Sequence, residues 1–282
     1  MVFGLIAFIL SAPTSADVAG IIPLADLNGG AARELSHFVI IDRDASYAHL
    51  KLRGWTVVVS RRLLMNDRPT ADRALLLLDR KLADIEQALN ARPLRQLKLV
   101  PIWIEATGCA GQQGLSYHWS SRWLRLHGCN PDKARSVEIH SVYDFLAWEP
   151  TQPWLVLHEL AHAYHQRVMG KNNASLVSAF VRAKRSGSYE HVSYRAQSSG
   201  RAYAMMNSSE YFAELTEAYF GVNDYFPFNR SELRRYDPNG FALVRTAWCD
   251  SGNVRSRAHR GRKSDSAKRK ALADVSAVPC KR

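Results

Sequence analysis

Residues 153–170 read PWLVLHELAHAYHQRVMG, an apolar run that carries three histidines and one glutamate. The proline at the start and Gly170 at the end are typical of helix boundaries, so we predict a helix over residues 152–169. Residues four apart share one face of a helix, so the imidazoles of His158 and His162 can reach one metal ion. Histidine nitrogens are common zinc ligands, and Glu159 can contact a water at an open position of the ion. The stretch therefore predicts a zinc site with His158 and His162 as ligands and Glu159 as the catalytic base.

The alternative is a chance match to a short pattern, but a buried helix with two histidines and a glutamate is costly unless these side chains have partners. His165 follows on the same face, yet about 10 Å of helix rise separates it from His158, so one ion cannot easily bind both. The metzincin pattern needs Gly at position 165 and His at 168, where this chain has His165 and Val168, and it is excluded. We expect His165 to hydrogen-bond to a neighbour or to line a cleft.

A second helix is predicted over residues 207–220, which read NSSEYFAELTEAYF and are followed by Gly221. This helix carries Glu210, Glu214 and Glu217 on one face, while its other sides are apolar. Carboxylates on an otherwise buried helix need a partner, and a metal with its histidines supplies one. The third zinc ligand is therefore expected from this helix; a solvated acidic stripe is the alternative.

The segment HELAH followed by NxxEYFAE resembles the zincin catalytic domains of the anthrax lethal factor type, over roughly residues 153–220. It also resembles uncharacterised bacterial secreted proteins with HELAHAYH and EYFAE segments. The resemblance implies that Glu210 is the third zinc ligand and that Tyr203, seven residues earlier, is catalytic. We expect Glu214 to accept a hydrogen bond from the free N–H of a ligand histidine. Glu217 is either a more distant member of that network or a charge on the helix face.

These residues predict a zinc metallopeptidase acting on a peptide or protein substrate. A bound zinc ion lowers the pKa of its water and polarises the substrate carbonyl. Glu159 then acts as general base, and Tyr203 donates a hydrogen bond to the oxyanion. The same residues would serve a zinc hydrolase of a non-peptide amide or ester. A third alternative is a binding protein on a zincin scaffold, with a basic tail for attachment.

Strands come first and the two active-site helices afterwards, which favours an α+β fold. The expected fold is a zincin-like domain with a mixed sheet, the HExxH helix and a second helix that bears the glutamate ligand. Strands are predicted within 47–64, 97–105 and 135–141, and a helix over 70–90 is closed by Pro93. Strand 135–141 is a candidate for pairing with an extended substrate, and 117–123 for lining a pocket. Residues 171–201 remain unassigned, and 223–238 are expected to form a loop or a short helix.

The N-terminal residues MVFGLIAFILSAPTSA have a short apolar run and a small-x-Ala site, so residues 1–16 are interpreted as a signal peptide. A buried strand is the alternative. The catalytic domain is expected over 17–249, strand-rich over about 36–145 and helical over about 150–249. No apolar run is long enough to span a membrane, and the protein is expected to be secreted or periplasmic.

The net charge of +12 is concentrated at the C-terminus, because residues 255–282 carry ten Lys/Arg against two Asp. Residues 250–282 are therefore expected to form a disordered basic tail, and no specific nucleic-acid partner is expected. The four cysteines include no C-x-x-C pair. In an exported protein Cys109 and Cys129 can close a disulfide loop, whereas otherwise they are buried thiols. Cys280 has no obvious partner.

Overall fold

The computed structural model describes residues 40–41, 46–195 and 198–249. The expected signal peptide, the basic tail and Cys280 lie outside the described residues. The described chain is α+β, as expected, and it divides into two compact units. Unit 1 combines the chain up to residue 77 with residues 101–147, and unit 2 combines residues 78–100 with the chain from residue 148 onward. Among the described residues, no helix has the length and apolar character that a membrane crossing needs.

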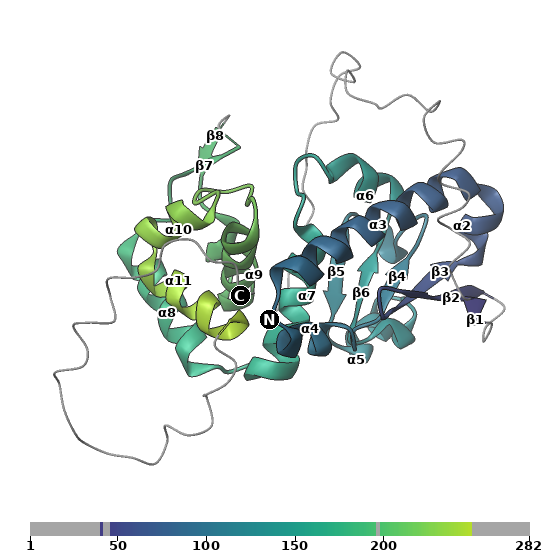
Figure 1. Cartoon of the computed structure of the whole chain (residues 1–282), viewed down its shortest axis with the longest axis horizontal. Helices are drawn as coiled ribbons and strands as arrows, with labels where there is room; N and C mark the ends of the chain where they lie inside the picture. Colours follow the sequence, from purple (N-terminus) through teal and green to yellow (C-terminus); the bar gives the residue numbers. More distant parts are fainter. Residues whose placement is uncertain (1–39, 42–45, 196–197, 250–282) are drawn as a thin grey trace. The chain divides into compact units, whose positions relative to one another are not determined.

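Unit 1 contains a six-stranded mixed sheet with the strand order β1-β2-β3-β4-β6-β5 (Figure 1). The first three strands are antiparallel neighbours, β3, β4 and β6 run parallel, and β5 is antiparallel to β6. The strands span Ile40–Ile41 (β1), Tyr47–Leu52 (β2), Trp55–Ser60 (β3), Ile102–Ile104 (β4), Leu115–His118 (β5) and Ser136–Ile139 (β6).

The centre of this sheet is apolar because its parallel strands are buried. Val57 of β3 pairs with Ile102 of β4, which in turn pairs with Val137 of β6, and all three side chains are fully buried. Continuous apolar runs of this kind are typical of parallel strands. The register places one apolar row across the middle of the sheet and leaves polar side chains nearer its β5 end.

Strand β6 is hydrogen-bonded on both sides, to β4 and to β5. A strand with both edges paired has no free backbone groups for a peptide, so the expectation that 135–141 pairs with a substrate was wrong. The strand at this end of the sheet is β5. The segment 117–123 divides between β5 and the helix α5 (Ser121–Leu126).

Several boundaries differ from those expected because helices replace parts of the predicted strands. Residues 61–66 form α2 (Arg61–Asn66), and the predicted 70–90 helix is α3 (Arg68–Ala88). Pro93 does not end this region but lies in the first turn of α4 (Ala91–Leu97), where its missing N–H needs no partner. The strand predicted from residue 97 therefore begins only at Ile102. The boundary between the two units falls within α3.

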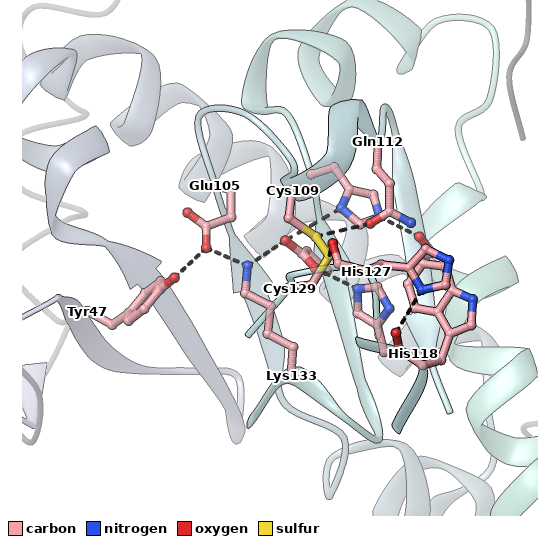
Figure 2. The surroundings of a disulfide bond; sticks show 12 residues. Tyr47, Glu105, Cys109, Gln112, His118, His127, Cys129 and Lys133 are labelled. Carbon is pink, nitrogen blue, oxygen red and sulfur yellow. Dashed lines mark hydrogen bonds and ion pairs between the residues drawn. A yellow bond between two sulfur atoms is a disulfide. The ribbon is translucent and has the colours of Figure 1, made fainter. Parts of the chain in front are cut away.

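A disulfide joins Cys109 and Cys129 across 20 positions of sequence and encloses β5 and α5 (Figure 2). Of the alternatives for these cysteines, the structure thus contains the disulfide. The neighbouring short elements of unit 1 are the 3-10 turns η3 (Cys109–Gly111) and η4 (Pro131–Lys133) and, at the unit boundary, α6 (Val142–Trp148).

Unit 2 is mainly helical, and α9 lies at its centre. This helix contacts α7, α8, α10 and α11, and Figure 1 shows α8, α10 and α11 grouped around it. The unassigned stretch 171–201 contains a helix and a two-stranded hairpin. The elements are α7 (Leu155–Tyr164), the π-helical turn η5 (His165–Gly170), α8 (Ala174–Ser186), β7 (Val192–Tyr194), β8 (Ser198–Gly200), η6 (Tyr203–Met205), α9 (Ser208–Phe220), α10 (Arg230–Tyr236) and α11 (Pro238–Trp248).

Aromatic side chains hold α7, α9 and α11 together. The ring of Trp248 stacks on Tyr164 at a centroid distance of 4.4 Å and on Phe212 at 5.7 Å. The indole N–H of Trp248 donates to the hydroxyl of Thr216, 3.1 Å away. Since Trp248 is fully buried, its polar atom needs this partner. These contacts fix which face of α9 is turned toward α7.

Candidate metal centre

The first part of the candidate site is α7, which is buried along nearly its whole length. His158 and Glu159 are each only 4% exposed, and His162 is partly exposed. One ligand atom from each of these three residues lies within 4.8 Å of the others. The helix of 152–169 is confirmed in its central part, but its last turn widens into the π-helical segment η5.

The second part is the first turn of α9, which begins where predicted. The side chain of Asn207 caps this helix by accepting hydrogen bonds from the backbone N–H groups of Ser209, at 2.8 Å, and Glu210, at 3.0 Å. The positive end of the helix dipole favours the carboxylate of Glu210. Its Oε2 atom lies 3.2 Å from Nε2 of His158 and 3.1 Å from Nε2 of His162. The structure thus brings together the three predicted ligands.

The outer nitrogen of His158 is held by Glu217. The Nδ1–H group donates to Oε1 of Glu217 over 2.7 Å, whereas Oε1 of Glu214 is 3.7 Å away. The expected acceptor, Glu214, is therefore corrected to Glu217, which lies almost two full turns beyond Glu210 on α9. Oε2 of Glu214 is buried and has no hydrogen-bond partner among the described residues. A hydrogen bond at Nδ1 fixes the tautomer that leaves Nε2 free to bind a metal.

The outer nitrogen of His162 is held by Ser209, a residue that the sequence analysis missed. The Ser209 hydroxyl lies 2.8 Å from Nδ1 of His162 and 3.2 Å from Nδ1 of His165. One hydroxyl can accept from His162 and donate to His165, so the three side chains form a chain of hydrogen bonds. His165 thus hydrogen-bonds to a neighbour, and burial lowers its pKa. The sequence contained one indication of a role for Ser209, namely that this residue directly precedes the predicted ligand Glu210.

Burial and neighbouring opposite charges act in opposite directions on the pKa values of His158 and Glu210. Burial on its own lowers the pKa of His158, but hydrogen bonds to Glu210 and Glu217 outweigh it and raise the pKa well above 6.5. Burial on its own raises the pKa of Glu210, but the charges and hydrogen bonds of His162 and His158 hold it well below its usual range. These shifts favour a protonated imidazole beside an ionised carboxylate in the metal-free site, and a divalent cation would replace that proton.

Three further carboxyl groups lie behind His158, and burial raises the pKa of each of them. Glu217 has the hydrogen bond to His158, which lowers its pKa in part. Asp224 accepts a hydrogen bond from the side-chain amide of Gln152 over 3.1 Å. Glu214 lies beside both and feels the charges of Asp224 and Glu217. Burial and the like charges of the neighbouring carboxylates thus both favour the protonated forms of these groups.

Tyr203 lies in η6, and η6 packs against α9. Burial, followed by the charges of Glu210 and Glu159, raises the pKa of Tyr203. The phenol therefore stays protonated at physiological pH and remains a hydrogen-bond donor. The charges of Glu210 and Glu159 both act on this phenol.

The two ligand-bearing helices approach closely at the end of α9. A Cβ atom added at Gly221 would lie 1.6 Å from Nε1 of Trp154, the residue that precedes α7. The φ of Gly221 is negative, at −158°, so the lack of space beside Trp154, rather than a positive φ, requires glycine here. This contact sets the spacing at one end of the helix pair.

The donor set suits zinc in its chemistry: two imidazole nitrogens, one carboxylate oxygen, and a hydrogen-bond partner for each outer nitrogen. Comparisons of the chain with protein-family models, with curated proteins and with solved structures found no match.

Proposed function

We propose that this chain is an extracytoplasmic zinc-dependent peptidase with a zincin-like catalytic domain. The observation that carries the proposal is the approach of Glu210 Oε2 to both His158 Nε2 and His162 Nε2, at 3.2 and 3.1 Å. Ligand atoms about 2.0–2.2 Å from one zinc ion lie at about this distance from each other. The resemblance of HELAH and NxxEYFAE to zincin domains of the lethal factor type agrees with the same three ligands.

Bound zinc would supply Lewis-acid polarisation of the scissile carbonyl and a lowered pKa for water. In this proposal Glu159 accepts the proton of the attacking water and returns it to the leaving amine. Tyr203 donates a hydrogen bond to the oxygen on which negative charge develops. Glu217 and Ser209 keep the two imidazoles in the tautomer that presents Nε2.

A buried glutamate between two ligands supports an enzyme rather than a binding protein. Glu159 is 4% exposed, and one of its carboxylate oxygens lies within 4.8 Å of a ligand atom of each histidine, where a base for a metal-bound water would be needed. The Cys109–Cys129 disulfide supports extracytoplasmic location, because such bonds persist in oxidising compartments.

The test is digestion of a peptide library by the full chain, read by mass spectrometry. Cleavage is expected from the zinc-loaded protein, absent after chelation, and restored by added zinc. Glu159→Gln, loaded with zinc to the same level, is the matched control and should be inactive. A zinc-loaded chain that cleaves no peptide but hydrolyses amide or ester probes in a chelator-sensitive way would replace the peptidase by the non-peptide hydrolase. Equal cleavage by Glu159→Gln would remove this site from the chemistry.

A further inference from the structure

Unit 1 contains a second group of buried side chains with metal-binding chemistry, independent of the site in unit 2. One ligand atom from each of His118, Glu138 and His140 lies within 4.8 Å of the others. Glu138 and His140 are fully buried and His118 is 5% exposed. Two imidazoles and a carboxylate buried together are uncommon without a proton or a cation to bind them.

The sheet register brings these residues to one face. Ser116 of β5 pairs directly with Glu138 of β6, so their side chains point the same way. His118 lies two residues after Ser116, and His140 two residues after Glu138, so alternation puts both on that face as well. The pairing of β5 with β6 therefore fixes where the three side chains lie. The Cys109–Cys129 disulfide closes the chain around β5 (Figure 2).

His140 has one ring nitrogen hydrogen-bonded to Ser116 and the other directed at Glu138. Its Nε2 is hydrogen-bonded to the Ser116 hydroxyl, while its buried Nδ1 has no hydrogen-bond partner among the described residues. This Nδ1 atom lies 3.5 Å from Oε1 of Glu138, so it points into the cluster. A ligand histidine has the same pattern, with the outer nitrogen held by a polar group and the inner one directed at the ion.

The other two candidate ligands, His118 and Glu138, face each other directly. Nε2 of His118 lies 2.6 Å from Oε2 of Glu138, which is the length of a hydrogen bond. The other carboxylate oxygen, Oε1, accepts from the ammonium group of Lys133 over 2.6 Å. Lys133 therefore occupies one oxygen of Glu138 and leaves the other, Oε2, on the side of His118.

The local charge favours a cation. Lys133 is shared between Glu138 and Glu105, with its Nζ atom 2.6 Å from an oxygen of each. Tyr47 donates to the same Glu105 oxygen over 2.8 Å, which fixes this outer carboxylate (Figure 2). One ammonium faces two carboxylates, so the formal charges of Lys133, Glu105 and Glu138 leave one negative charge in excess.

We propose that His118, Glu138 and His140 form a second site for a divalent transition-metal ion, zinc by its donor chemistry, within unit 1. The ion replaces the proton between His118 and Glu138, and the two atoms separate from 2.6 Å to about 3.3 Å, the spacing of two ligands on one zinc ion. Ser116 holds the outer nitrogen of His140, and Lys133 orients Glu138. The site links β5 to β6 and plays a structural role, since it includes neither Glu159 nor Tyr203.

The competing occupant is a proton on one of the two imidazoles, which would also balance the excess charge. The experiment distinguishes a bound zinc ion from a bound proton by measuring zinc binding to the full chain. Zinc is the only metal added, and any affinity tag is removed. The background is the double variant His158→Ala/His162→Ala, which lacks two ligands of the unit 2 site and leaves unit 1 unchanged. Zinc per chain is measured by equilibrium dialysis and elemental analysis, and folding by circular dichroism.

One zinc ion per chain is expected to remain in this background. His140→Gln should remove it, whereas His191→Gln, at an exposed histidine of unit 2, should not. Because His140→Gln can impair folding, Ser116→Ala is the second variant; it keeps every direct ligand and should weaken zinc binding about 10–100-fold. A background variant that binds no zinc, or whose zinc is unaffected by both His140→Gln and Ser116→Ala, overturns the proposal in favour of the proton. Failure of the proposed unit 2 site would give a different result. In that case His158→Ala, made in the otherwise native chain, would leave the zinc content unchanged.

Discussion

Nδ1 of His158 lies 2.7 Å from Oε1 of Glu217, while Nε2 of the same ring lies 3.2 Å from Oε2 of Glu210. Both carboxylates come from α9, so one helix contacts both nitrogens of a single imidazole on α7. The inner carboxylate is a proposed metal ligand, and the outer one determines the tautomer and the direction of the ring. The affinity of the proposed site for a metal ion should therefore depend on how α9 is rotated about its own axis.

Glu217→Ala should weaken zinc binding about 10–100-fold, because the ring of His158 loses the partner that orients it. Glu214→Ala is the matched comparison: this residue is on the same helix and is buried, but it is 3.7 Å from Nδ1. It should change affinity much less. Competition with a chromophoric chelator measures both. Equal losses in the two variants would show that the charge of the cluster, rather than the hydrogen bond of Glu217, determines affinity.

Ser209→Ala should also weaken zinc binding, again about 10–100-fold, because the outer nitrogen of His162 loses its hydroxyl partner. Ser208→Ala tests whether shortening any serine in this turn has the same effect, since Ser208 is the first residue of the same helix. The same chelator competition is suitable, with melting temperature measured in parallel. If Ser209→Ala binds zinc like the parent, a water or another group must fill the position of its hydroxyl.

Glu159→Gln should retain zinc and the fold but lose turnover. The amide has the shape of the carboxylate, so the packing of α7 is kept, whereas it cannot accept the proton of the attacking water. Zinc content, melting temperature and cleavage of the best library peptide are measured on one preparation. Loss of zinc together with activity would instead make Glu159 part of the metal-binding set.

Tyr203→Phe should reduce turnover by about 10²–10³-fold, the usual effect of removing one oxyanion donor. The phenyl ring remains, so stability and zinc content should stay near those of the parent. The reduction is expected in kcat rather than KM, because the hydrogen bond strengthens as charge develops. Activity equal to that of the parent would assign Tyr203 to packing alone.

Zinc binding should strengthen as the pH rises from about 6 to 8. The pKa of His158 is raised well above 6.5 in the metal-free protein, so zinc must displace its proton over this range. One displaced proton per ion corresponds to about a tenfold change in the apparent Kd per pH unit. The folding stability of the metal-free protein depends on pH in the opposite direction. The stability contributed by protonated His158 is fully present below pH 6.5 and is lost as the pH rises through the raised pKa. Zinc affinity that does not change with pH would mean that His158 carries no proton in the metal-free site.

Two of the proposed ligands in unit 2 could be predicted from helical spacing, which brings His158 and His162 to one face of α7, whereas Glu210, on a second helix, was implied by the resemblance to zincin domains. His158 and His162 are four residues apart on α7, and Glu210 follows the cap residue Asn207. The hydrogen-bond partner of Nδ1 of His158 could not be predicted, because Glu214 and Glu217 both lie at helical spacing on the same face of α9. The choice between them depends on the rotation of α9, which is set by its contacts with Trp248 and the other helices.

Unit 1 was harder to predict for a different reason. The sequence favoured strands near 47–64, 97–105 and 135–141, but their order and pairing come from long-range register. Ser116 and Glu138 are neighbours only because β5 folds back on β6, and no local pattern specifies that. The helix α4 was missed because Pro93 was interpreted as a stop, whereas proline is tolerated in a first turn.

The disulfide has a consequence for the order in which the protein matures. Cys109 and Cys129 precede all three proposed ligands in unit 2, so a chain that emerges N-terminus first presents both thiols before α7 exists. Oxidation can then close the loop around β5 and α5 while the metal-binding helices are still to come. In a reducing cytosol this early step is absent. In an oxidising compartment the disulfide can therefore form before any proposed ligand of unit 2 has emerged, whereas in a reducing one a metal would meet a chain whose first loop is still open.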